Sequence, residues 1–253
     1  MGPRGRRLRI RRPLAVPFPD ARRRGLAESF LPPLPARPSR AAALVAAMQL
    51  KDPYTRGHGD RVGEAAALIG AELRLPADAL RDLRLAGTLH DIGKLAVPGC
   101  LLRKPGPLTP AERETVQRHP RHGYALVCGS EVPAVARVAV LHHHERLDGG
   151  GYPHGLAGRR IPWPARIVSV ADALDAMTST RSYRPARPVA AALAELRRCA
   201  GSQFDPAVVS ALARALARHP WPPPALPGTP AAAATPAAPV SAPAAHGGAS
   251  CRM

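Results

Sequence analysis

The sequence contains few aromatic residues and no long hydrophobic run. Phe, Trp and Tyr make up 4% of its 253 residues, although 45% of the chain is hydrophobic. This composition disfavours a sheet built from aromatic and β-branched side chains and favours helices packed through small residues. No segment approaches the roughly 20 apolar residues that span a bilayer, since Pro13, Pro17 and Pro19 interrupt the candidate stretch near the N-terminus. We therefore predict an all-α protein that is soluble and has no membrane span.

Cysteine is scarce as well. The chain contains Cys100, Cys128, Cys199 and Cys251, and no two of them form a C-x-x-C pair. Because zinc ribbons need such pairs and small disulfide-stabilised domains need a dense cysteine framework, the pattern indicates neither kind of site. It is typical of a protein in a reducing compartment, and we expect a cytoplasmic location.

Acidic residues are half as frequent as basic ones, with 18 Asp and Glu against 36 Lys and Arg, and the formal net charge is +18. Half of this excess lies in residues 1–40, which carry eleven Arg and only two acidic residues. The same segment is rich in proline and cannot bury enough apolar surface to fold, so we predict a disordered tail. A polyanion-binding arm is the alternative interpretation. Since so much of the charge lies in this tail, we expect no specific nucleic-acid partner.

A second low-complexity segment, 219–253, is rich in Pro and Ala and is also predicted to be a disordered tail. The domain is therefore predicted to span 41–218, where apolar residues recur with helical spacing. Thr109 and Glu112 form a capping box at one predicted helix start, and Asp205 caps another. We predict a loop over 148–164, a helix end at Pro120, and helices over 41–50, 61–74, 76–89, 109–119, 134–145, 164–178, 189–199 and from 206 onward.

The strongest chemical signal is His90-Asp91-Ile92-Gly93-Lys94, at the end of a predicted helix. Neighbouring His and Asp side chains can bind one cation, and the two oxygens of Asp91 can bridge a pair of cations. An isolated His-Asp pair means little, but residues of the same kind recur on other predicted helices. Since helical bundles build metal sites from ligands on several helices, this recurrence favours a metal centre in the core. The further residues are His58, His119, His143, His144 and Asp172.

The order of these residues resembles that of the HD superfamily of metal-dependent phosphohydrolases. Residues 143–153, His-His-Glu-Arg-Leu-Asp-Gly-Gly-Gly-Tyr-Pro, are similar to the extended motif of the HD-GYP family within it. The resemblance runs from about Leu50 to about Ala215. It implies a compact helical bundle of the HD-domain type with a Gly-rich loop, in which Gly151 is one of the glycines and Tyr152 and Pro153 form the tip.

The resemblance also implies which residues bind metal and substrate. Two divalent ions per chain are expected, with iron and manganese the leading candidates, because imidazoles and carboxylates together suit borderline divalent ions. Asp91 would be shared by both ions, and Lys94 would act with it in catalysis as a positive charge at the phosphate. Arg181 and Arg184 would be the other phosphate contacts. One ion would be held by His58, His90, Asp91 and Asp172, and the other by Asp91, His119, His143 and His144.

For the activity, the resemblance implies a phosphodiesterase of bacterial signal transduction that hydrolyses cyclic di-GMP by means of a metal-bridging hydroxide. The product would be linear pGpG, with further hydrolysis to GMP left open. Two alternatives stay open: an HD phosphohydrolase that acts on another cyclic dinucleotide or on nucleotides, and a non-catalytic cyclic di-GMP sensor or interaction module. A regulatory protein partner at the loop around Tyr152 and a homodimer are further expectations that the resemblance raises.

Three residues depart from the family pattern. Tyr54 stands where three-metal members carry a glutamate, which favours a centre with two metals. Gly150 and Ser182 replace a usual Ser and a usual Pro, and these changes alter loop stiffness rather than chemistry.

Three more residues lie close to the predicted ligands in the sequence. Asp175 follows Asp172 by three on the same predicted helix, and it either orients a ligand histidine or is a surface carboxylate. His122 and His142 match no ligand position, and we interpret both as surface or secondary residues.

Overall fold

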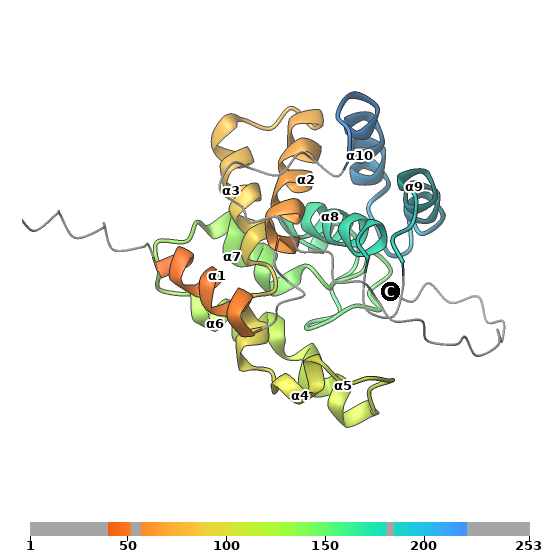
Figure 1. The fold of residues 1–253 in the computed structure, drawn as a ribbon. Helices are drawn as coiled ribbons and strands as arrows, with labels where there is room; N and C mark the ends of the chain where they lie inside the picture. The colour runs from red at the N-terminus through yellow and green to blue at the C-terminus, as the bar shows by residue number, and fades with distance from the viewer. Residues whose placement is uncertain (1–39, 52–56, 181–184, 222–253) are drawn as a thin grey trace, which may run out of the picture. The chain divides into compact units, whose positions relative to one another are not determined.

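Helices make up the regular structure of the described residues, which are 40–51, 57–180 and 185–221 of the computed structural model (Figure 1). No β-strand occurs among these residues, so the prediction of an all-α fold is confirmed. The predicted tails lie almost entirely outside the described residues. The helices are α1 (Arg40–Lys51), α2 (His58–Glu72), α3 (Ala77–Leu89), the 3-10 helix η2 (Ile92–Ala96), α4 (Gly99–Leu102), α5 (Pro110–Gln117), α6 (His119–Val127), α7 (Ala134–His142), the 3-10 helix η3 (Gly158–Arg160), α8 (Trp163–Thr178), α9 (Val189–Arg198) and α10 (Pro206–Arg218).

Two predicted caps define helix starts. At the start of α5, the Thr109 hydroxyl accepts a hydrogen bond from the backbone N–H of Glu112, and the Glu112 carboxylate accepts one from the N–H of Thr109. Asp205 caps α10 by accepting a hydrogen bond from the N–H of Ala207. Both caps are thus confirmed, and each satisfies backbone donors that a helix start leaves unpaired.

The predicted role of Pro120 is wrong. Helix α5 already ends at Gln117, and Pro120 lies in the first turn of a separate helix, α6. Proline is well tolerated there, because the first N–H groups of a helix have no partner within it. The break between the two helices lets His119 begin α6 with its side chain buried. The short helices η2 and α4 were not predicted either, and the helix predicted over 134–145 ends at His142.

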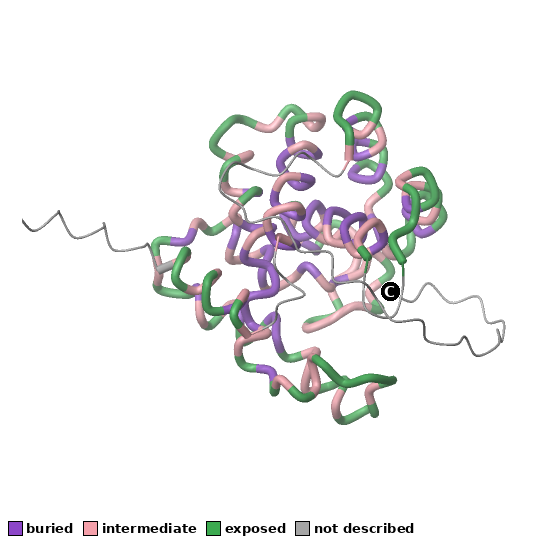
Figure 2. The backbone as a smooth tube through the Cα atoms, in the orientation of Figure 1, coloured by how far each residue is buried: buried purple, intermediate pink, exposed green. Residues whose placement is uncertain are grey.

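The core forms around α8, which packs against α2, α3, α7, α9 and α10. Buried residues concentrate where α2, α3, α7 and α8 meet (Figure 2). Ile167, Val170 and Leu174 of α8 are fully buried, and each such side chain contributes about 1.5–3 kcal/mol relative to an exposed one. A helix that is apolar around most of its circumference belongs inside a protein. Its carboxylates, Asp172 and Asp175, are therefore held in the middle of the helical assembly.

Glycines let α2 and α3 approach closely. A Cβ on Gly63 would lie 2.4 Å from the carbonyl oxygen of Arg84, and a Cβ on Gly87 would lie 2.4 Å from the backbone N of Gly63. Only glycine fits at either position, because a side chain would overlap the backbone of the facing helix. The close approach brings the start of α2 to the end of α3. The ring centroids of His58 and His90 consequently lie 5.1 Å apart.

A second close approach joins η2 to α6. A Cβ on Gly93 would lie 1.8 Å from the carbonyl oxygen of His119 and 2.4 Å from the backbone N of Gly123. The glycine of the His-Asp-Ile-Gly-Lys motif is therefore required for packing, since any side chain would push α6 away. This contact holds His119 near Asp91.

Among the described helices, none combines the length and the apolarity needed to cross a membrane. Cys100 and Cys128 are free and exposed. Beyond α10, Trp221 donates a hydrogen bond from Nε1 to Thr178 Oγ1 at 2.9 Å. Ordered contacts therefore continue to residue 221.

Candidate metal centre

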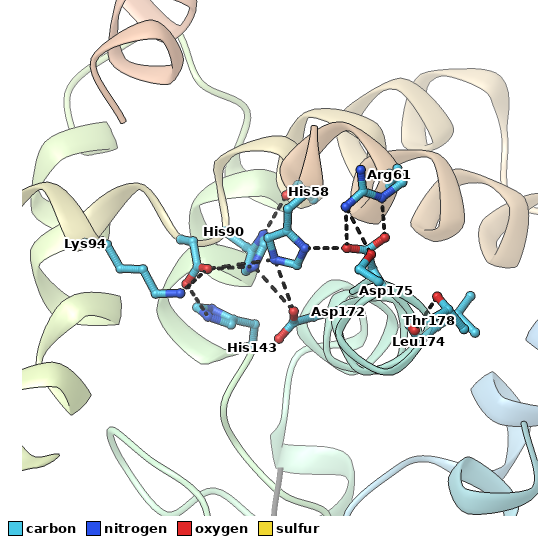
Figure 3. Close-up of polar contacts among 12 residues, drawn as sticks. His58, Arg61, His90, Lys94, His143, Asp172, Leu174, Asp175 and Thr178 are labelled. Carbon is cyan, nitrogen blue, oxygen red and sulfur yellow. Dashed lines mark hydrogen bonds and ion pairs between the residues drawn. The ribbon is translucent and has the colours of Figure 1, made fainter. Parts of the chain in front are cut away.

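Seven side chains with metal-binding atoms meet near the ends of α2, α3, α6 and α7 and beside α8. Figure 3 labels four of them, His58, His90, His143 and Asp172. The seven are the residues that the sequence predicts as metal ligands. They fall into two clusters, in each of which the candidate ligand atoms lie within 4.8 Å of one another. The Asp91 cluster contains Asp91, His119, His143 and His144, and the His58 cluster contains His58, His90 and Asp172.

Asp91 lies between the two clusters. Its Oδ1 is 3.2 Å from His119 Nε2 and 3.9 Å from His143 Nε2. Its Oδ2 faces the other cluster, 3.4 Å from His90 Nε2 and 3.9 Å from His58 Nε2. Only 4% of the Asp91 side chain is exposed. One buried carboxylate thus presents one oxygen to each cluster, which is the arrangement that a ligand bridging two ions requires.

Backbone carbonyl groups orient three of the imidazoles. The Nδ1 atom of each lies within 3.0 Å of the carbonyl oxygen three residues earlier, which belongs to Gly87 for His90, to Val116 for His119 and to Val140 for His143. A carbonyl oxygen only accepts hydrogen bonds, so Nδ1 carries the proton and Nε2 presents its lone pair to the centre. His90 Nε2 is buried and has no hydrogen-bond partner. A buried acceptor without a partner costs free energy, and a metal ion at this position would satisfy it.

Two charged residues hold His58 (Figure 3). Its Nδ1 donates to Asp175 Oδ2 at 2.7 Å, while its Nε2 faces Asp172 Oδ1 at 3.3 Å. Arg61 donates to both oxygens of Asp175, at 2.5 Å and 3.0 Å. The Asp175 side chain is 2% exposed. Of the two interpretations of Asp175, the structure therefore favours the one in which it orients a histidine.

Burial and neighbouring charges set the protonation states of the Asp91 cluster. Burial lowers the pKa of His144 to about 3, and burial together with neighbouring imidazoles holds the pKa of His143 well below its ordinary value. Burial works against the charge of Asp91, but Lys94, with Nζ 2.5 Å from Oδ2, and His90 outweigh it and hold the pKa of Asp91 well below its usual range. Asp91 is thus anionic and His143 and His144 are neutral, which are the forms that bind metal.

The protonation of His58 leads to a prediction for metal binding. Burial lowers its pKa, but hydrogen bonds with Asp172 and Asp175 outweigh burial and raise the pKa to about 9. Below this pH, His58 must release a proton before it can bind an ion. We therefore expect the apparent affinity of the His58 cluster for Mn²⁺ to rise about tenfold per pH unit and to level off above pH 9. Calorimetric titration in buffers of different ionisation enthalpy measures the proton release. Binding without any proton release at neutral pH would contradict the prediction.

Replacement of Asp175 by Asn tests its orienting role. The amide cannot balance the charges of His58 and Arg61, so we expect the free energy of unfolding to fall by about 1–3 kcal/mol. Metal affinity at the His58 cluster is expected to fall about 10–100-fold. Denaturant unfolding and metal titration measure the two effects. The matched control is Glu64→Gln, which removes a carboxylate paired with Arg84 at the surface and should change neither quantity; unaltered metal affinity in Asp175→Asn would rule the orienting role out.

The loop segment Gly151–Pro153 packs against the Asp91 cluster. The Tyr152 ring stacks on His144, with ring centroids 4.8 Å apart and 28° between the ring planes. The backbone N–H of Tyr152 also donates to the carbonyl oxygen of His144 at 3.2 Å. Burial, together with the charges of Asp91 and Asp172, raises the pKa of Tyr152, so the phenol stays neutral. The ring therefore covers one side of the cluster without adding charge.

Some predicted residues lie outside the described residues. Tyr54 belongs to the segment 52–56, and Arg181, Ser182 and Arg184 belong to the segment 181–184. The phosphate contacts of the two arginines and the effect of Tyr54 on the number of metals therefore stay predictions.

The two other histidines considered in the sequence analysis, His122 and His142, differ in their surroundings. His122 is exposed, as predicted for a surface residue. His142 is half-buried and lies with Glu145 and His154 in a third group of potential metal-binding atoms, which the sequence analysis missed. The spacing of His142 and Glu145, three residues apart at a helix end, is a weak signal for this group. The loop folds back and brings His154 beside these two residues, and no pattern in the sequence predicts this.

Comparisons with known proteins agree with this geometry. A family model described as an HD domain matches residues 42–208. The cyclic di-GMP phosphodiesterase response regulator RpfG of Xanthomonas campestris pv. campestris is 44% identical over 177 residues, which cover 69% of this chain and 47% of that protein. The 3'3'-cGAMP-specific phosphodiesterase 3 of Vibrio cholerae is 42% identical over 168 residues, which cover 66% of this chain and 36% of that protein. The chain thus spans less than half the length of these two curated relatives.

A solved structure shows a similar fold. The HDG"Y"P protein Bd1817 of Bdellovibrio bacteriovorus superposes with a TM-score of 0.52 at 22% sequence identity, and the match covers 70% of this chain and 57% of that chain. At this level of identity the likeness concerns the fold alone. The predicted HD-type arrangement of helices is thereby confirmed.

Proposed function

Since the chain belongs to the HD domain family and to the HD-GYP group within it, we propose that it is a metal-dependent phosphodiesterase that hydrolyses cyclic di-GMP to linear pGpG. The observation that carries the proposal is the position of Asp91, whose two oxygens face two clusters of imidazoles. A shared anionic ligand of this kind can hold two ions close enough to act together on a phosphodiester. Relatives named as phosphodiesterases of cyclic dinucleotides support the choice of substrate class.

We propose two divalent ions per chain, iron or manganese. Neutral imidazoles with carboxylates suit these ions, whereas magnesium would require more oxygen ligands. When bound, the ions would supply Lewis-acid activation of the phosphodiester and of the attacking water. The residues that would hold them are His58, His90, Asp91 and Asp172 for one ion and Asp91, His119, His143 and His144 for the other.

Side chains around the two clusters have separate tasks in this proposal. The Lys94 ammonium group lies 2.5 Å from Asp91 Oδ2 and its side chain is 25% exposed, so it can meet a phosphate that enters from the solvent side. A positive charge there stabilises the negative charge that develops during phosphodiester cleavage. The Tyr152 ring keeps water from the face of His144 that it covers. Arg181 and Arg184, outside the described residues, are proposed as additional phosphate contacts.

We extend the proposal to partners and location. The loop around Tyr152 is proposed as the contact surface for a regulatory protein, because loops carried by a rigid helical scaffold often serve recognition. The proposed location is the cytoplasm, where nucleotides are made and degraded. A homodimer is also proposed, and the molecular mass in solution tests it.

A second candidate substrate is 3'3'-cGAMP. The relative from Vibrio cholerae that carries this name is 42% identical to the chain, nearly as similar as the relative named for cyclic di-GMP. Both molecules present two phosphodiesters in a small ring, and the two ions would act on either in the same way. The described metal centre therefore does not discriminate between guanine and adenine, and base specificity has to come from contacts farther from the phosphate.

A substrate panel tests the proposal. The purified chain is loaded anaerobically with Mn²⁺ or Fe²⁺ and incubated separately with cyclic di-GMP, 3'3'-cGAMP and cyclic di-AMP, and chromatography resolves the products. We expect pGpG from cyclic di-GMP at the highest rate and no product after metal removal by a chelator. Faster turnover of 3'3'-cGAMP would mean that 3'3'-cGAMP, and not cyclic di-GMP, is the substrate. Tight binding of cyclic di-GMP without cleavage under both metals would make the chain a sensor instead.

A further inference from the structure

A third group of metal-binding side chains lies beside the loop that contains Tyr152. It consists of His142, at the end of α7, Glu145, just after that helix, and His154, on the loop. Candidate ligand atoms of the three residues lie within 4.8 Å of one another. None of them belongs to the Asp91 cluster or to the His58 cluster, so the function proposed above leaves this group unused.

Glu145 is the anchor of the group. Its side chain is 0% exposed, although a carboxylate loses much hydration free energy when it is buried. The backbone N–H of His154 donates to Oε1 at 2.8 Å, and that of Leu156 donates to Oε2 at 2.9 Å. These two hydrogen bonds fold the loop back onto the end of α7. Because a carboxylate oxygen has two lone pairs, each oxygen can still accept another partner.

His142 points at this carboxylate without forming a hydrogen bond to it. Its Nδ1 is buried and has no hydrogen-bond partner, and it lies 3.7 Å from Glu145 Oε1. This separation is too long for a hydrogen bond between nitrogen and oxygen. It is close to the separation of about 3.4 Å between two ligands that bind one zinc ion tetrahedrally at about 2.1 Å each. The pair is therefore spaced for an ion between the two atoms.

His154 completes the group from the solvent side. Its ring centroid lies 5.2 Å from that of His142, and its side chain belongs to an exposed residue. The group thus has one buried member, one half-buried member and one exposed member. An ion can enter from solvent past His154 and still bind to the buried carboxylate of Glu145 and to the half-buried imidazole of His142.

We propose that His142, Glu145 and His154 form a separate metal site for a borderline divalent ion such as Zn²⁺. Two imidazoles and one carboxylate are a ligand set that zinc uses, with a fourth position left to water. The site does not depend on the identity of the substrate proposed above. Its ion would join the loop to α7 by bonds to side chains, in addition to the hydrogen bonds of Glu145.

The position of the site gives the ion a regulatory role. His154 follows Pro153 directly, and Tyr152 stacks on His144 of the Asp91 cluster. An ion bound by His142 and His154 would hold the loop in the position where the Tyr152 ring covers His144. Zinc concentration would then control how freely this side of the catalytic centre opens.

Metal stoichiometry tests the proposal without an activity assay. The wild-type chain and His154→Ala are dialysed against the same micromolar free Zn²⁺, and the zinc bound per chain is measured by elemental analysis. Both proteins keep the seven residues of the two main clusters, so the difference reports on the new site. We expect His154→Ala to bind one zinc fewer per chain. Equal zinc content in the two proteins would overturn the proposal.

Two further variants and a second readout make the test specific. His122→Ala removes an exposed histidine of α6 and is expected to bind as much zinc as the wild type. His142→Ala is expected to lose the same single ion as His154→Ala. Hydrogen exchange of the backbone amides of His154 and Leu156 should slow on zinc addition in the wild type and in His122→Ala, but much less in His142→Ala. Equal slowing in His142→Ala would also overturn the proposal.

Discussion

Replacement of Asp91 by Asn is expected to remove most of the bound metal and to lower phosphodiester hydrolysis at least about 10³-fold. The amide keeps the shape of the side chain but lacks the negative charge that faces both clusters. One cluster would then face a neutral amide oxygen, which is a much poorer ligand for a divalent ion, and the other would face an NH2 group, which only donates hydrogen bonds. Because one residue serves both clusters, the loss should affect both ions together. Elemental analysis of metal content and the rate of pGpG formation measure the two effects.

A matched substitution separates this effect from a general loss of charge. Asp78→Asn makes the same chemical change on the first turn of α3, where the side chain is 84% exposed. It is expected to keep full metal content and activity. Wild-type turnover in Asp91→Asn would refute the shared-ligand arrangement. Loss of a single ion in that variant would show that Asp91 serves one cluster only.

Replacement of Lys94 by Gln is expected to lower hydrolysis about 10²–10³-fold while leaving metal content unchanged. The ammonium group lies beside Asp91, but it is not among the candidate metal ligands. Its loss should therefore act on the phosphate rather than on the ions, as a fall in kcat at nearly constant KM. Lys94→Arg is expected to recover part of the activity, because it restores the positive charge.

The control for this substitution is Lys104→Gln. Lys104 is also paired with a carboxylate, that of Glu112 at 2.6 Å, but it lies at the surface away from both clusters. The Lys104→Gln substitution should leave kcat and KM unchanged. If Lys94→Gln lost metal in proportion to activity, Lys94 would be a residue that stabilises the centre and not one that contacts the phosphate.

Residues grouped by a local motif were the easiest to predict. His90 and Asp91 are adjacent in the sequence, and so are His143 and His144. Each pair can therefore be picked out as a candidate metal-binding motif from neighbouring residues alone. The structure brings these residues together with the other three predicted ligands, while their role as ligands stays a prediction. Helix starts with a side-chain cap, as at Thr109, were also predictable, because the cap is a property of a few consecutive residues.

Features that depend on long-range packing were not predictable. Pro120 is compatible both with a helix end and with a first turn, and only the packing of α6 against η2 decides between them. Asp175 is one turn from Asp172, but its role depends on Arg61, which is 114 residues away in the chain. His154 meets His142 only because the loop folds back on Glu145. In each case the deciding contact joins residues whose sequence separation carries no periodic signal.

The contact between Gly63 and Gly87 has a consequence for how this chain can change over evolutionary time. The spacing of α2 and α3 is set by their backbones, so substitutions on the outer faces of these helices can accumulate without moving His58 relative to His90. A single added methyl group at either glycine would instead push the two helices apart, since it would lie 2.4 Å from backbone atoms of the facing helix. The positions at which the candidate metal centre tolerates least variation therefore include two that have no side chain at all.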